Sequence, residues 1–157
     1  MSAQYFEDIA IGAKRTSGSY TFTGEDIIRF AQKYDPQPFH IDLVAAKNGP
    51  FGELVASGWH TVSVWMKLTI ESRALDGNAG GTVRAGVSPG FEDLQWSKPV
   101  RSGTTLFYSS EVIEKVELKS RPEWGIVKSR NEARDADGEL YMRFIGKGFV
   151  ARRPPVE

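Results

Sequence analysis

Two side chains that can move protons lie close together in the stretch YDPQPFHID, residues 34–42. Asp35 and His40 flank Pro36 and Pro38, and His40 is one of only 2 histidines in the chain. Each proline restricts its own backbone and that of the residue before it. Because a stiffened segment loses less entropy when it holds a fixed geometry, we expect Asp35 and His40 to be held ready for acid–base chemistry on one shared water molecule.

The residues beside this pair are apolar, which predicts a partly dry site. Phe39 and Ile41 flank His40 directly. Desolvation disfavours the charged form of a carboxyl group, so we expect burial to raise the pKa of Asp35 and to strengthen its interaction with the imidazole. A structural alternative stays open at this point, in which Asp35 caps a turn and His40 is an ordinary packed histidine.

A predicted helix start follows the pair in the stretch ASGWHT, residues 56–61. Ser57 is a typical N-cap residue, and the first N–H groups of a helix are unpaired and partly positive. Gly58 has no side chain to block a ligand carbonyl, so its N–H is expected to bind a thioester oxygen as negative charge develops there. Ser57 either caps the helix or orients a catalytic group. We expect His60, one turn inside, to be packed and structural.

Other patterns in the chain do not predict a site. GVSPG, residues 86–90, matches the serine-hydrolase pattern G-x-S-x-G, but Pro89 lacks the N–H that the oxyanion site of that motif requires. GNAGG, residues 77–81, lacks the Lys-Ser/Thr that completes a phosphate loop. The chain has no cysteine, and its two histidines lie too far apart for a familiar metal-binding pattern. We therefore expect no metal site.

The elements that position these residues follow from periodicity and from turn signals. A helix over 24–34 should begin with a capping box formed by Thr23 and Asp26 and end before Pro36. In the helix over 58–74, Val62, Trp65, Met66 and Ile70 are expected to line one face. The remaining expected elements are a strand over 14–23, a helical turn over 43–47, strands over 91–96, 105–118, 124–135 and 139–153, and a hairpin turn at 136–138.

This order predicts an α+β fold in which one curved antiparallel sheet wraps around a long helix. The 157 residues correspond to one ordinary domain. A curved open sheet keeps unpaired edges, and pairing one edge with a second copy would cover it, so we expect a homodimer or an oligomer of dimers. The balance of 20 basic and 20 acidic residues provides no electrostatic argument for nucleic acid or an anionic membrane. No signal-peptide pattern or membrane-length apolar run stands out, which fits a cytoplasmic protein.

Three segments together resemble the MaoC-like dehydratases, a family that includes the (R)-specific enoyl-CoA hydratases. They are YDPQPFHID, FGELVASGWHT and GVSPGFEDLQWSKPVRSGTTL, and the resemblance extends over roughly residues 5–150. The family motif Asp-x-Asn-Pro-x-His is matched by Asp35, Pro38 and His40, with Gln37 in place of the asparagine. The longer Gln37 amide is expected to alter the hydrogen bond that positions the loop. The small-residue pair at the start of the central helix corresponds to Ser57 and Gly58.

The resemblance implies a single hot-dog domain over residues 1–157, dimers that share a sheet, and an acyl-CoA tunnel along the subunit interface. The implied reaction is hydration of a trans-2-enoyl-CoA to an (R)-3-hydroxyacyl-CoA and the reverse dehydration. We favour His40 as the group that deprotonates water and Asp35 as the proton donor. Coenzyme A belongs to the substrate, and no metal or redox cofactor is implied. An acyl-CoA thioesterase and a non-catalytic acyl-CoA-binding module remain alternatives.

Overall fold

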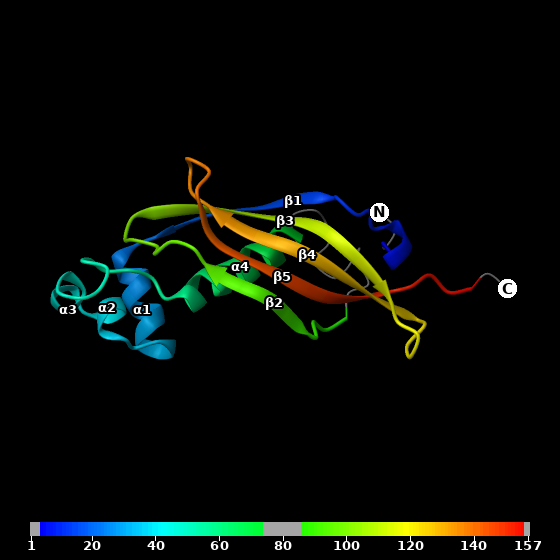
Figure 1. Ribbon diagram of the computed structural model, residues 1–157, viewed down its shortest axis with the longest axis horizontal. Helices are drawn as coiled ribbons and strands as arrows, with labels where there is room; N and C mark the ends of the chain where they lie inside the picture. The colour runs from blue at the N-terminus through cyan, green and yellow to red at the C-terminus, as the bar shows by residue number, and fades with distance from the viewer. Residues whose placement is uncertain (1–3, 74–85, 156–157) are drawn as a thin grey trace.

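The computed structural model describes residues 4–73 and 86–155. Within these residues, five strands form one antiparallel sheet in the order β1-β3-β4-β5-β2 (Figure 1). The strands are β1 (Lys14–Phe22), β2 (Gly90–Trp96), β3 (Thr104–Glu117), β4 (Trp124–Arg134) and β5 (Leu140–Ala151). β1 and β2 therefore form the two edges of the sheet within the described chain.

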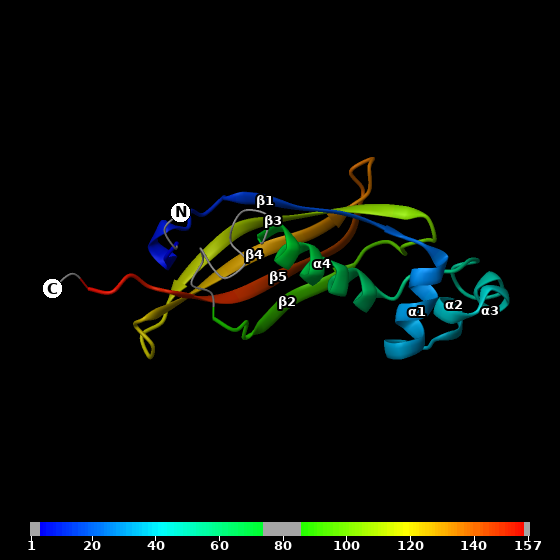
Figure 2. The same ribbon diagram turned by 180° about the vertical axis from the view of Figure 1, so that it is seen from behind.

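One long helix, α4 (Gly58–Arg73), lies along one face of the sheet (Figure 2). Three shorter helices, α1 (Gly24–Tyr34), α2 (Pro38–Ile41) and α3 (Leu43–Lys47), gather beside the N-terminal end of α4. A single 3-10 turn, η1 (Phe6–Asp8), precedes β1. This arrangement is a hot-dog fold, which confirms the α+β prediction.

The core holds the first half of α4 against the sheet. Fully buried Phe22, Leu106 and Met142 belong to one apolar cluster that also includes Val64 of α4. Two polar side chains fix the helix further: the Tyr108 hydroxyl donates to the Thr61 carbonyl at 3.0 Å, and Trp65 Nε1 donates to Asn131 Oδ1 at 3.0 Å. Burial of apolar surface and satisfied buried hydrogen bonds together determine where the N-terminal end of α4 lies.

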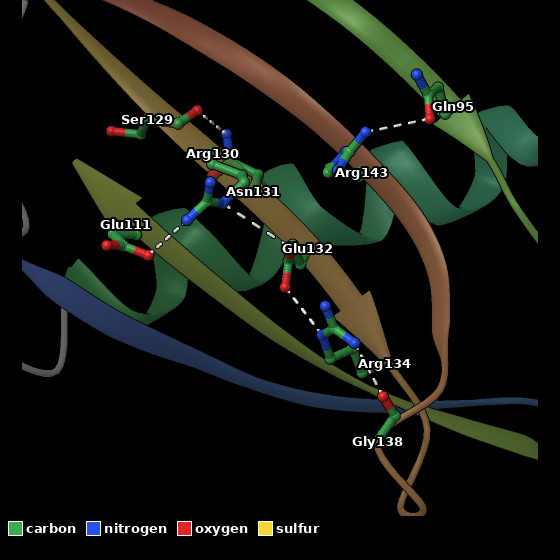
Figure 3. A network of polar contacts seen from close by, with 9 residues as sticks. All are labelled: Gln95, Glu111, Ser129, Arg130, Asn131, Glu132, Arg134, Gly138 and Arg143. Atoms are coloured by element: carbon green, nitrogen blue, oxygen red, sulfur yellow. Dashed lines mark hydrogen bonds and ion pairs between the residues drawn. The ribbon is translucent and has the colours of Figure 1, made fainter. Parts of the chain in front are cut away.

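The opposite face of the sheet carries charged side chains that pair with one another (Figure 3). Arg130 Nη2 donates to Glu111 Oε2 at 2.8 Å, and Arg134 Nε donates to Glu132 Oε2 at 2.9 Å. Alternation along a strand sends successive side chains to opposite faces, so one face packs on α4 while the other faces solvent. Among the described residues, no helix combines the length and the apolar character required to cross a membrane.

Most predicted elements match the structure closely. The helix over 24–34 and the turn over 43–47 have the predicted bounds, and Thr23 accepts a hydrogen bond from the Asp26 N–H as the N-cap. Each later strand begins and ends within two residues of its predicted bounds. The last predicted residue of the helix over 58–74 and the GNAGG stretch, residues 77–81, lie outside the described residues.

Two features differ from the prediction. The one-turn helix α2 was not predicted, although Pro38 occupies its first turn, where proline is well tolerated. The predicted apolar face of α4 does not coincide with its buried face. Met66 and Ile70 are exposed, whereas four other residues are buried: His60, Thr61, Val64 and Thr69. An apolar residue on almost every side of a helix does not reveal which side the sheet covers.

Candidate active site

The backbone around Asp35 ends one helix and begins the next within four residues. Asp35 is the C-cap of α1: its N–H still donates to the Ala31 carbonyl at 2.9 Å, but its φ of −154° has left the helical region, because Pro36 follows. Gln37 is extended before Pro38, and Pro38 starts α2. The single turn of α2 then carries His40 back toward Asp35.

Asp35 and His40 face each other across a short distance. His40 Nε2 lies 3.3 Å from Asp35 Oδ2. His40 Nδ1 lies 2.6 Å from the Val55 carbonyl oxygen, which can only accept, so Nδ1 carries the hydrogen and donates it. In the neutral imidazole, Nε2 is therefore an acceptor that faces a second acceptor. A water molecule beside the pair, within hydrogen-bond distance of both atoms, would donate one hydrogen to each.

Two neighbours hold the Asp35 carboxylate. Gln37 Nε2 donates to Asp35 Oδ1 at 2.8 Å, and the Ser57 side chain also hydrogen-bonds to the carboxylate. Burial alone raises the pKa of Asp35, but the hydrogen bonds from Ser57 and Gln37, together with the charge of His40, outweigh it and leave the pKa below its ordinary value. Burial thus acts in the expected direction, but the net pKa of Asp35 is lowered, because the donors around the carboxylate stabilise its charged form.

Ser57 caps α4, which is one of the two roles that its sequence position left open. Its side chain is fully buried, and Oγ accepts a hydrogen bond from the Trp59 N–H at 3.3 Å, as expected of a helix cap. The same side chain bonds to Asp35, so it also links the start of α4 to the carboxylate. Replacing Ser57 would therefore disturb the helix start and the charge of Asp35 together.

Gly58 lies at the start of α4 beside an indole ring. Among the described residues, no acceptor bonds to its N–H, which leaves this donor available to a ligand. The space that a Cβ would occupy is filled, because three atoms of the Trp96 ring lie within 2.7 Å of that position. Trp96 thus requires a glycine at this position, a steric reason that the sequence did not reveal.

These residues line a common cavity of about 360 Å³, a volume in the range of small-molecule sites. Asp35, Gln37, His40 and Gly58 provide polar groups to its wall. Most of the remaining wall is apolar or aromatic and consists of Phe39, Phe51, Val55, Ala56, Trp59, Trp96, Pro99 and Val100. Four of the predicted site residues are thus brought together at one cavity, whereas Pro38 and Ser57 do not line it. Sequence reasoning missed Trp59 and Trp96.

His60 lies outside this cavity and is packed, as expected. Its ring stacks on Phe30 with a centroid distance of 4.5 Å and meets Phe22 edge to face at 4.9 Å. Burial lowers the pKa of His60 to about 4, and nearby Asp26 offsets this only in part. Within the described residues, its Nδ1 has no hydrogen-bond partner.

Two other features carry no catalytic arrangement. The Ser88 hydroxyl of the G-x-S-x-G match is exposed and donates to the Lys147 carbonyl at 2.6 Å, and Pro89 leaves no N–H beside it. Among the described residues, no group of three or more histidine and acidic side chains is arranged to hold a metal ion.

Known proteins match this chain over most of its length. The family model for the MaoC like domain matches residues 8–132. The chain is 31% identical over 140 residues to the uncharacterized protein YdeM of Bacillus subtilis, covering 85% of this chain and 94% of that protein. It is 33% identical to a solved MaoC-like dehydratase from Rhodospirillum rubrum, with a TM-score of 0.82, covering 98% of this chain and 100% of that chain.

A relative with a named reaction is more distant. The mesaconyl-CoA hydratase of Haloarcula marismortui is 28% identical over 123 residues, which cover 78% of this chain. The match covers only 32% of that hydratase, so the present chain spans about a third of its relative. The segment matched by the family model contains Asp35, His40, Ser57 and Gly58.

Proposed function

Because this chain belongs to the MaoC-like dehydratase family, we propose that it hydrates a trans-2-enoyl-CoA to an (R)-3-hydroxyacyl-CoA and catalyses the reverse dehydration. The observation that carries this proposal is the 3.3 Å approach of His40 Nε2 to Asp35 Oδ2, in a cavity that Gly58 also lines. A water that donates to both acceptors would have its lone pairs directed away from the pair, toward a bound substrate.

His40 accepts the proton of the attacking water. The water oxygen bonds to the β-carbon, the double-bond electrons move toward the thioester carbonyl, and the water proton passes to Nε2. The resulting imidazolium then returns this proton to the α-carbon, so that one water is added and His40 is regenerated. Asp35, ionised because its pKa is lowered, orients the water and stabilises the imidazolium. This role differs from the proton donor expected from the sequence, because the hydrogen bonds around the Asp35 carboxylate favour its ionised form.

The Gly58 N–H stabilises the enolate-like oxygen that forms between these two steps. It belongs to the first residue of a 16-residue helix, where backbone donors are unpaired and the helix dipole favours negative charge. A preorganised donor of this kind contributes about 3–4 kcal/mol to transition-state stabilisation. The reaction needs neither a metal nor a redox cofactor, and coenzyme A enters as part of the substrate.

A second copy of the chain completes the site in this proposal. Trp59, Met66 and Ile70 form an exposed apolar stripe along α4, and Phe91 and Trp96 continue it onto the edge strand β2. Trp59 and Trp96 also line the cavity. Burying this stripe and pairing the open edge of β2 would form a homodimer and would cover the acyl-CoA at the subunit interface.

Crotonyl-CoA tests the proposed reaction against thioester hydrolysis. We expect the enoyl absorbance to fall without release of free CoA thiol, and a panel of longer enoyl-CoAs to define the acyl group. Release of thiol at the rate at which enoyl absorbance is lost would favour a thioesterase. Binding of crotonyl-CoA without either change would favour an acyl-CoA-binding module.

A further inference from the structure

We propose that Trp96 is a positioning residue that fixes the Gly58 backbone for its part in catalysis, an inference that rests on the proposed function. Trp96 ends the edge strand β2 and follows Gly58 by 38 residues in the chain. Glycine has the greatest backbone freedom of all residue types, and Gly58 lies at a helix end, where backbone order is weakest. If the Gly58 N–H is to stabilise the charge that develops on the substrate oxygen, a contact from outside the helix must hold the Gly58 backbone in place.

The first support is direct packing. Ring atoms Cδ2 and Cζ2 of Trp96 lie 2.6 and 2.7 Å from the position that a Cβ on Gly58 would take. No real Cβ approaches another atom so closely, so the indole packs directly on the Gly58 Cα. The ring thereby limits how far the Gly58 backbone can move toward β2.

The second support is a pair of hydrogen bonds to one carbonyl. Trp96 Nε1 donates to the Gly58 oxygen at 3.1 Å, and the Thr61 hydroxyl donates to the same oxygen at 2.6 Å. The Thr61 oxygen also lies 3.3 Å from the sulfur of Met142, whose backbone pairs with Trp96 across β2 and β5. Gly58, Thr61, Met142 and Trp96 thus form a closed set of contacts between the helix start and the sheet.

The indole is itself held in place. Trp59 packs edge to face against it, with ring centroids 5.3 Å apart and an interplanar angle of 81°. A fixed ring matters because a catalytic donor displaced by a fraction of an ångström stabilises the transition state much less. Since the substrate carbonyl carries little charge before reaction, loss of this support should lower kcat more than it weakens ground-state binding.

Two Trp96 variants separate the two supports. Trp96→Phe keeps an aromatic ring over Gly58 but removes the N–H donor, whereas Trp96→Ala removes both. We expect kcat for crotonyl-CoA hydration to fall ~3–10-fold in the first and ~10–100-fold in the second, with Kd for butyryl-CoA changed less than ~3-fold in both. Trp124→Phe is the matched control and should leave kcat unchanged, because Trp124 packs on Phe149 at the start of β4.

The outcomes distinguish this inference from the proposed function. Thermal unfolding and sedimentation of each variant report folding and assembly, and Trp96→Phe carries the test where Trp96→Ala does not fold. An active wild type in which both variants keep kcat within ~2-fold, or lose only substrate affinity, would overturn the positioning role alone. A folded wild type that hydrates no enoyl-CoA would overturn the proposed function, and the positioning role with it.

Discussion

His40 Nε2 lies 3.3 Å from Asp35 Oδ2, although Asp35 ends one helix and His40 belongs to another. Pro36 ends α1 at Asp35, and Pro38 begins the single turn of α2 that brings His40 back. The Val55 carbonyl then orients the imidazole by accepting from Nδ1. Two acceptors therefore lie side by side in a mostly apolar cavity, where one water within reach of both would donate a hydrogen to each.

Removing either member of this pair should abolish most of the activity. In the proposed mechanism, Asp35→Asn removes the charge that stabilises the imidazolium, and His40→Ala removes the base. We expect each to lower kcat for crotonyl-CoA hydration at least ~10²-fold without unfolding the protein. Asp42→Asn is the control, because Asp42 only caps α3 and asparagine is an equally good cap. A near wild-type rate in Asp35→Asn or in His40→Ala would exclude the pair as the catalytic centre.

Gln37 should set the pH at which Asp35 loses its charge. The pKa of Asp35 is below its ordinary value of 3.8, so the acid limb that it contributes to the pH–rate profile lies below pH 3.8. Gln37→Ala removes the donor to Oδ1 and should raise this pKa, which moves the acid limb to higher pH. A carboxyl NMR titration of both proteins measures the change directly. An unchanged or lower Asp35 pKa in Gln37→Ala would contradict the role given to this amide.

Gly58→Ala should destabilise the fold through overpacking against Trp96. The added methyl would collide with the indole, so we expect a loss of about 1–3 kcal/mol in the free energy of unfolding. The double variant Gly58→Ala/Trp96→Ala lacks the indole and therefore the collision. The losses in free energy of unfolding caused by the two substitutions should then be less than additive. Urea unfolding of the four proteins completes the cycle. Strict additivity would show that the two residues do not interact.

His60 should make the fold less stable in acid. The pKa of His60 is about 4 in the folded protein and 6.5 when unperturbed, so between these values the unfolded chain binds a proton that the folded chain does not. The contribution of His60 to the free energy of unfolding is fully present above pH 6.5. It decreases as the pH is lowered to about 4, by about 3 kcal/mol in total.

His60→Phe keeps the aromatic packing against Phe30 and removes this titration. The difference in free energy of unfolding between wild type and His60→Phe should therefore change with pH over this interval and become constant below it. A pH-independent difference would show that His60 titrates alike in the folded and unfolded states.

Local signals predicted a large part of this structure. The cap at Thr23 and the proline at position 36 correctly predicted the two ends of α1. The prolines on either side of Gln37 indicated a restricted backbone between Asp35 and His40. These features depend on residues within a few positions of each other. The order of one long helix and alternating strands likewise predicted an antiparallel sheet around that helix, and the family resemblance implied the hot-dog fold.

Long-range contacts account for what the sequence did not reveal. The buried face of α4 depends on which side the sheet covers, and Trp96 meets Gly58 across 38 residues of chain. The lowered pKa of Asp35 depends in part on Ser57, which belongs to the start of a different helix. No periodicity or spacing rule reports such contacts, because they arise only when distant elements pack.

Water labelled with oxygen-18 tests the central claim most directly. If Asp35 and His40 add water to the β-carbon, incubation with crotonyl-CoA should place the label in the 3-hydroxyl group of an intact thioester, and Asp35→Asn should slow this labelling at least ~10²-fold. Label in the carboxylate of a free acid, or no incorporation by the folded wild-type protein, would contradict the account.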